Sequence, residues 1–250
     1  MIEIDALRDY CDGLLAGSEF DDYCPNGLQV EGDRPIRHLI SGVSVSLALI
    51  EAAIAQGADG ILVHHGFFWK GESPCLVGMR GRRIRTLMRS GISLFAYHLP
   101  LDAHPKLGNN RQLAHVLGIL DAHPVASGQG LLWQGRLPNP LGKGDFVAMT
   151  ARILGREPLH ISGHECPLET LAWSTGAAQG YLEEAARLGV DGFLSGEISE
   201  RTTHQACELG VDYFAAGHHA TERYGVQALG AFLAERFGLE HRFLDLDNPA

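Results

Sequence analysis

The sequence predicts an α/β protein made of two related domains with mixed sheets, and three observations support this. Short apolar runs typical of buried strands alternate with amphipathic segments typical of helices along 250 residues. The hydrophobic content of 45% is sufficient for a core of this size. A helix, a glycine and a strand recur in the same order in both halves, which indicates an internal duplication.

One apolar run ends in two adjacent histidines. Ile61, Leu62 and Val63 form a strand-like segment that is followed directly by His64 and His65. Ligands of open α/β sheets bind at the carboxyl ends of strands. Because side chains alternate across a strand, two neighbouring metal ions suit this pair better than one shared ion. Taken alone, the pair would also fit one core histidine beside one surface histidine.

The rest of the first half alternates helices with strands. Helices are expected where apolar residues recur at helical spacing, and one of them ends in a glycine. A Pro-Asn-Gly turn at residues 25–27 leads into the first strand. The expected helices are 3–15, 46–57, 82–90 and a segment that ends near 117, and the expected strands are 28–30, 36–45 and 92–97.

A second strand in this half also runs into a histidine. The segment 92–97 is followed by His98, and Asp102 comes four residues later in a loop stiffened by Pro100. The aromatic residues 67–69 lie just past the first histidine pair. They could wall a pocket or be buried at a subunit contact, and the sequence leaves both open.

The second half begins after a stretch rich in glycine, proline and asparagine at residues 121–145. We therefore place the first domain at 1–125, with 226–250 as a candidate segment to complete it, and the second at 126–225. A helix over 146–154 and short strands around 159–161 and 171–173 are expected in the second domain.

The two halves match at two offsets. Residues 44–62 align with 176–194 at an offset of 132, and Asp59 and Gly60 are among six identities. At an offset of 119, residues 91–96 align with 210–215. The first alignment sets Glu197 against His65. Two matches in the same order favour an internal duplication. We expect a metal site in the cleft between the two halves.

The last histidine cluster follows the second copy of the repeat. His218 and Glu222 are four residues apart at the start of a helix expected from about Ala220, where they could converge on one ion. The simpler alternative is a histidine that caps the helix and a glutamate in its first turn. The other strand ends that carry histidine strengthen the metal interpretation.

Hydropathy, cysteine spacing and net charge indicate which compartment, metal site and partners to expect. No apolar run is long enough for a membrane span and the first residues do not resemble a signal peptide, so we expect a cytoplasmic protein without a membrane partner. The five cysteines form no C-x-x-C pair, which argues against a thiolate zinc site. The formal charge of −10 disfavours nucleic acid as a partner.

Several of these motifs together resemble the Nif-three-like family, whose bacterial members are named GTP cyclohydrolase I type 2 homologs. The similarity runs from about Asp21 to the C-terminus. The motifs that carry it are His64-His65-Gly66, the residues from His98 to Asp102 with Gly108-Asn109-Asn110, the turn from Cys24 to Val30, and the residues from Gly217 to Glu222.

The resemblance implies a two-domain α/β subunit that holds a dinuclear metal centre and assembles as a ring-shaped hexamer. The metal ligands carried over by motif are His64, His65, Asp102, His218 and Glu222, and His98 is an additional candidate. Histidine and carboxylate ligands suit two divalent ions of zinc, manganese, iron, cobalt or nickel.

The expected function is metal-dependent hydrolysis of a nucleotide-like substrate, as in the family name. The alternative is a non-catalytic, metal-stabilised ring that binds a protein or nucleic-acid partner. Glu197 is a candidate general acid or base because the repeat aligns it with His65, and the simpler alternative is a carboxylate that starts a helix.

Overall fold

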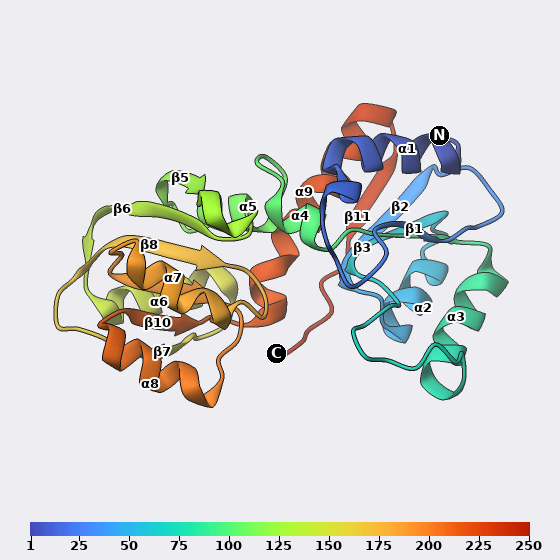
Figure 1. Ribbon diagram of the computed structural model, residues 1–250. Coiled ribbons are helices and arrows are strands. Elements are labelled where there is room, and N and C mark those ends of the chain that lie inside the picture. Colours follow the sequence, from blue (N-terminus) through green and yellow to red (C-terminus); the bar gives the residue numbers. More distant parts are fainter. The chain divides into compact units, whose positions relative to one another are not determined.

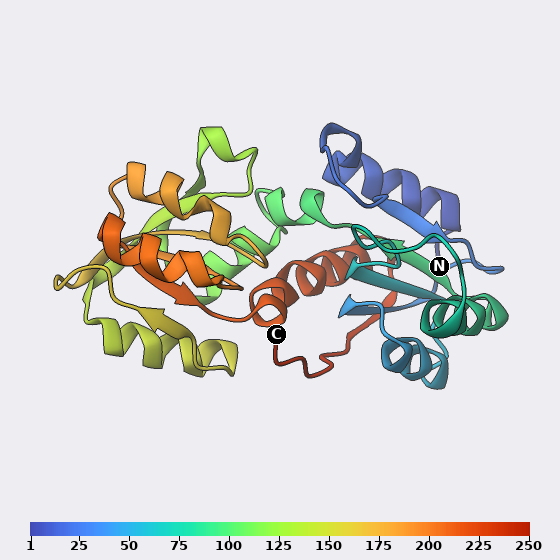
Figure 2. The same ribbon diagram turned by 60° about the horizontal axis from the view of Figure 1, so that its bottom comes forward.

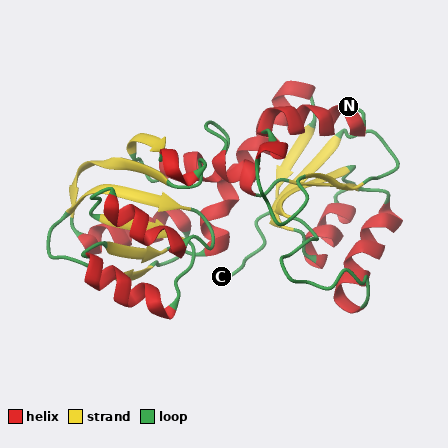
Figure 3. Cartoon of the chain, in the orientation of Figure 1, coloured by secondary structure: helices red, strands yellow, loops and turns green.

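The computed structural model describes residues 1–250, and the chain divides into two compact units. Unit 1 comprises Met1–Leu101 and Val226–Asp247, and unit 2 comprises Asp102–Gly225 and Asn248–Ala250. Each unit is built on one mixed sheet with helices packed against it (Figures 1 and 3). The predicted fold class is confirmed.

Unit 1 has a five-stranded sheet in the order β1-β4-β3-β2-β11. The four strands from β4 to β11 are parallel, and β1 pairs antiparallel with β4 at the edge. The strands are β1 (Gly27–Val30), β2 (His38–Ser44), β3 (Gly60–His65), β4 (Ser93–Ala96) and β11 (Glu240–Phe243). Because β2, β3 and β4 are parallel neighbours, their carboxyl ends lie at one edge of the sheet.

Helices cover the sheet of unit 1. α2 (Leu47–Ala55) and α3 (Gly78–Ser90) bury Leu49, Ile50 and Leu87 in one core cluster with residues of β2, β3 and β4. α1 (Ile4–Leu15) lies beside the last part of α9 (His218–Phe237), and the ring of Tyr10 contacts the ring of Phe237 (Figure 1).

Unit 2 has a six-stranded sheet in the order β5-β6-β8-β9-β10-β7. β8, β9 and β10 are parallel, and the remaining pairs are antiparallel. The strands are β5 (Leu120–Pro124), β6 (Trp133–Leu141), β7 (Leu159–Ile161), β8 (Leu168–Ser174), β9 (Gly192–Ser195) and β10 (Asp212–Ala215).

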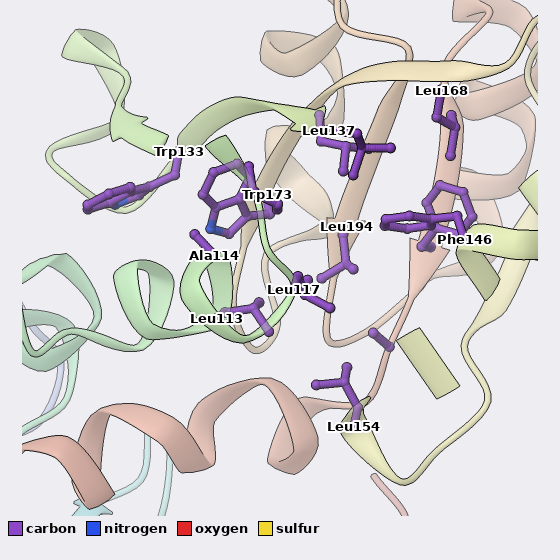
Figure 4. Packing of buried hydrophobic residues seen from close by; sticks show 14 of the residues in the cluster. Leu113, Ala114, Leu117, Trp133, Leu137, Phe146, Leu154, Leu168, Trp173 and Leu194 are labelled. Atoms are coloured by element: carbon purple, nitrogen blue, oxygen red, sulfur yellow. The ribbon is translucent and has the colours of Figure 1, made fainter. Parts of the chain in front are cut away.

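The sheet of unit 2 has a core cluster on each face. Trp173, Leu194 and Phe214 point to one face, where α5 (Asn109–Val116) and α6 (Lys143–Leu154) pack (Figure 4). Their neighbours in sequence point to the other face, where α7 (Leu182–Arg187) and α8 (Glu200–Leu209) pack (Figure 2). This alternation is what buries both faces of a central strand.

The two sheets share one topology. Both contain an antiparallel edge strand followed by three parallel strands, in the orders β1-β4-β3-β2 and β7-β10-β9-β8. The repeat found in the sequence aligns β3 with β9 and β4 with β10. The remaining strands distinguish the units, since β11 extends one sheet and β6 with β5 extends the other.

The structure divides the chain at Leu101 and Asp102, whereas the sequence suggested residue 125. Residues 102–125 belong to unit 2 because α5 contributes Leu113 to its core and β5 pairs with β6. Two helices, α4 (Leu99–Ala103) and α9, contain residues of both units. None of the helices is both long enough and apolar enough to cross a membrane.

Candidate functional site

Three histidines meet at the carboxyl edge of the sheet in unit 1. His64 and His65 end β3, and His98 lies two residues past β4, the neighbouring parallel strand. One ligand atom from each lies within 4.8 Å of the others. The ring centroids of His64 and His65 are 4.5 Å apart, so consecutive residues of this strand end present their rings to the same region.

Hydrogen bonds at the Nδ1 atoms orient these rings. His64 Nδ1 lies 2.9 Å from the carbonyl oxygen of Tyr97, and His98 Nδ1 lies 2.9 Å from a carboxylate oxygen of Asp22. Because carbonyl and carboxylate oxygens only accept, both rings donate from Nδ1 and keep the lone pair on Nε2. This is the form in which histidine ligates metal ions. His65 Nδ1 is 3.0 Å from the Ser44 hydroxyl.

Unit 2 contributes a histidine and a carboxylate from the N-terminal part of α9. His218 Nε2 lies 2.9 Å from Glu222 Oε2, and their spacing of four residues along a helix places the two side chains side by side. Gly176, which has a φ of +67°, lies next to this pair, and its lack of a side chain leaves space for the His218 and Glu222 side chains. A Cβ atom there would collide with Glu222 Oε1 and lie 3.2 Å from His218 Nε2.

Glu197 forms a hydrogen bond with the second ring nitrogen of His218. Its Oε1 accepts a hydrogen bond of 2.7 Å from His218 Nδ1. Burial opposes protonation of the ring, but the carboxylates of Glu222 and Glu197 outweigh it and raise the pKa of His218 to about 9. α8 begins at Glu200, so Glu197 lies before the helix and does not start it.

Asp102 is buried in unit 2 with an ordered set of donors. Its Oδ1 accepts hydrogen bonds from Asn109 Nδ2 at 2.8 Å and from the Thr175 hydroxyl at 3.2 Å. Asn109 is held in turn by the backbone N–H of Gly225. Thr175 is not among the residues predicted from the sequence, although its position directly after β8 is a strand end of the kind that carries the histidines.

The donors in both units fit divalent transition metals. Unit 1 supplies three imidazole nitrogens, and unit 2 supplies one imidazole and two buried carboxylates, with Asp102 5% and Glu222 3% exposed. Imidazole suits zinc, iron and nickel, and carboxylate oxygen suits manganese. Unit 1 therefore contains a cluster of residues that could bind metal, and unit 2 contains a histidine and two carboxylates of the types that ligate metal.

Comparison with known proteins identifies the family. A family model described as Duf34/NIF3 (NGG1p interacting factor 3) matches residues 2–249. The chain is 59% identical to an Allochromatium vinosum protein and 51% identical to a Pseudomonas aeruginosa protein, both named GTP cyclohydrolase 1 type 2 homolog. The alignments cover 100% of this chain in both cases and 98% and 99% of those proteins.

Solved structures agree with the sequence comparisons. The protein ybgI, described as of unknown function, has a TM-score of 0.96 at 43% identity, and TTHA1606 from Thermus thermophilus has a TM-score of 0.90 at 35% identity. Both comparisons cover 100% of this chain and 100% of the other. The resemblance found in the motifs is confirmed, and the chain belongs to the Duf34/NIF3 family.

Proposed function

We propose that this chain is a metalloprotein that holds two divalent ions through the ligands of both units. The ligands are His64, His65 and His98 of unit 1 and Asp102, His218 and Glu222 of unit 2. Six donors exceed the four that saturate one tetrahedral ion, which supports two ions per chain. The observation that carries the proposal is the Nδ1 hydrogen bond of His64 and His98 to an oxygen acceptor, because it leaves Nε2 of each neutral ring as the ligating nitrogen. His218 makes the same Nδ1 hydrogen bond, and a metal would displace the proton that its Nε2 shares with Glu222.

The path of the chain supports the proposal that ligands from both units bind the same pair of ions. Asp102 follows His98 by four residues, and the units divide within α4 between these residues. α9 carries His218 and Glu222 in unit 2 before it continues into unit 1. Both helices that contain residues of the two units therefore carry candidate ligands.

The reaction that suits these ligands is hydrolysis. Bound divalent ions act as Lewis acids and supply a hydroxide nucleophile at neutral pH. Within the chain, Glu197 is the candidate general acid or base. Its side chain is 42% exposed, and only Oε1 is engaged by His218, so Oε2 could exchange a proton with a substrate.

A nucleotide-like substrate is suggested by the relatives named GTP cyclohydrolase 1 type 2 homolog. A turnover assay across several substrate classes tests this suggestion. We would load the protein with zinc, manganese, iron, cobalt or nickel and measure turnover of a panel of nucleotides and phosphoesters. Product that depends on metal and is lost in His64→Ala supports the hydrolase. A matched control is His204→Gln, which removes an exposed histidine of α8.

The alternative is a metal-stabilised ring without catalytic activity, and one observation favours assembly of copies. Unit 1 exposes apolar side chains around α3 and the loop before it, from 39% to 72% of their surface: Phe68, Trp69, Leu76, Val77, Met79 and Met88. Exposed apolar residues in one region are typical of protein contacts. We propose a homohexamer, which light scattering would test. Full metal occupancy without turnover of any substrate would support the scaffold.

The compartment that fits this chemistry is the cytoplasm. No disulfide joins the five cysteines, and reduced thiols are typical of proteins in a reducing compartment.

A further inference from the structure

Asp22 is a buried carboxylate in the loop before β1, and it accepts a hydrogen bond from the ring of His98. Its side chain is 2% exposed. His98 Nδ1 lies 2.9 Å and 3.1 Å from its two oxygens. Oδ2 also accepts from Asn26 Nδ2 at 3.0 Å and from the backbone N–H of Leu99 at 3.1 Å. The Cys24 thiol lies 3.5 Å from Oδ1.

The same loop also holds the backbone of His98. Asn26 Oδ1 accepts a hydrogen bond of 2.7 Å from the His98 N–H. Asp22 orients Asn26 in turn, because it accepts from the amide that carries this oxygen. One pair of loop residues therefore fixes both the position of His98 and the rotation of its ring.

The hydrogen bond to Asp22 decides which nitrogen of His98 can ligate. The carboxylate accepts only, so the neutral ring carries its proton on Nδ1 and its lone pair on Nε2. Without Asp22, the neutral ring could carry the proton on either nitrogen. A ligating histidine whose other nitrogen donates to a carboxylate is also a more basic ligand.

We propose that Asp22 is a positioning residue that commits Nε2 of His98 to the histidine cluster of unit 1. This inference rests on the proposed metal function. His218 of unit 2 has the same arrangement, with Glu197 in place of Asp22 at 2.7 Å. The duplicated histidines after β4 and β10 are thus each oriented by a carboxylate from another segment.

Asp22 is a carboxylate that accepts hydrogen bonds from the His98 ring, from Asn26 Nδ2 and from the backbone N–H of Leu99. A charged acceptor forms stronger hydrogen bonds than a neutral amide would. Replacement by asparagine should therefore weaken the orientation of His98 even though the size is kept.

The same atoms offer one competing arrangement. Ligand atoms of Asp22, Cys24 and His98 lie within 4.8 Å of one another, so these residues could hold an ion themselves. In that case His98 would ligate through Nδ1 and could not donate to Asp22. Such an ion would depend on the Cys24 thiol, whereas the positioning role of Asp22 would not.

The test compares Asp22→Asn and Asp22→Ala with Asp21→Asn, which removes an exposed neighbouring charge. The first readout is the tautomer of His98 in metal-free protein, from ¹⁵N chemical shifts at a pH where the ring is neutral, with His98→Gln to assign the signals. We expect the Nδ1–H form in the wild type and in Asp21→Asn, and a mixture of tautomers in both Asp22 variants.

The second readout is zinc affinity by competition with a chelator. We expect a loss of about 10-fold to 100-fold in Asp22→Ala, a smaller loss in Asp22→Asn and none in Asp21→Asn. A cavity of about 300 Å³ adjoins Asp22 and is also lined by Asp12, Ser18 and Cys24. Formate should enter it in Asp22→Ala and restore part of the lost affinity, whereas chloride at the same ionic strength should not.

Unchanged tautomer and zinc affinity in the Asp22 variants would overturn the inference. A loss of zinc in Cys24→Ser as large as in Asp22→Ala would also overturn it, because the ion would then lie on Asp22, Cys24 and His98. If Asp22→Ala does not fold, Asp22→Asn decides. If the wild type binds no zinc, the metal function fails, and the tautomer alone still decides whether Asp22 orients His98.

Discussion

Asp59 and Asp191 lie 132 residues apart and make the same hydrogen bonds in the two units. Oδ2 of Asp59 accepts from the backbone N–H groups of Arg37 and His38 at the start of β2. Oδ2 of Asp191 accepts from those of Glu169 and Thr170 at the start of β8. The duplication therefore extends beyond the order of the strands to individual polar contacts. Each aspartate ties the loop before one parallel strand to the start of its neighbour.

The first prediction concerns the acid stability that Asp191 confers. Burial disfavours its charge, but hydrogen bonds from Thr170 and Glu169 outweigh burial and lower its pKa. A lowered folded-state pKa means that the stabilisation is complete above the unfolded value of about 4 and is lost as pH falls through the folded value. Asp191→Asn should reduce the free energy of unfolding by about 1–3 kcal/mol at pH 7 and by less at pH 3.

Urea denaturation at both pH values measures this effect. Asp59→Asn should behave in the same way, because the pKa of Asp59 is lowered by equivalent backbone hydrogen bonds together with Arg34. Asp247→Asn, at an exposed position near the C-terminus, is the control. Equal losses at pH 3 and pH 7 would contradict the electrostatic origin.

The second prediction is that Glu222 bridges the two proposed ions. Glutamate has two oxygens that can each take one ion, and its charge offsets repulsion between two dications. Glu222→Gln should therefore lose at least one metal per chain, more than any single histidine variant, while the fold persists. Elemental analysis together with a thermal melt measures both properties.

Glu235→Gln, on an exposed position of the same helix, should keep the metal content of the wild type. Retention of both ions with unchanged affinity in Glu222→Gln would mean that another group, such as Asp102, forms the bridge.

The third prediction concerns Gly176. Its φ of +67° is matched by the φ of +72° at Gly189, so an alanine at either position should cost about 1–2 kcal/mol of stability. Only at Gly176 would the added Cβ collide with the carboxylate of Glu222, since Gly189 has open space around it. Gly176→Ala should therefore lose metal, whereas Gly189→Ala should not. Equal metal content in the two variants would show that Glu222 can move aside without loss of a ligand.

The fourth prediction separates two roles of Glu197. Glu197→Gln keeps an oxygen that can accept from His218 Nδ1, so both ions should still bind at saturating metal, with no more than the small loss of affinity expected for Asp22→Asn. The amide cannot exchange a proton as a carboxylate does, so any turnover should fall by about 10²-fold to 10⁴-fold. Glu200→Gln, which removes an almost fully exposed carboxylate three residues later, should have neither effect. Normal turnover in Glu197→Gln would rule out the catalytic role and leave only the orientation of His218.

The sequence by itself determined the parts of this protein that depend on local pattern. The strand that ends in His64 and His65 and the repeat were predictable. A helix at His218 and Glu222 was predictable too, although it begins at His218 and not near Ala220 as expected. Hydrophobic periodicity, turn residues and the spacing of four along a helix are properties of neighbouring residues. Burial of the apolar run Ile61–Val63 as a strand places the two histidines that follow it at the strand's carboxyl end.

Only the tertiary structure decided which distant residues meet. Asp22 reaches His98 across 76 residues, Thr175 reaches Asp102 across 73, and the strand β11 pairs with β2 from the far end of the chain. A lone aspartate in a loop has no local signal, because a side chain of its kind caps turns throughout proteins. The role of Asp22 arises when packing removes its side chain from water and brings His98, Asn26 and Leu99 within hydrogen-bond distance, which happens only after the unit has folded.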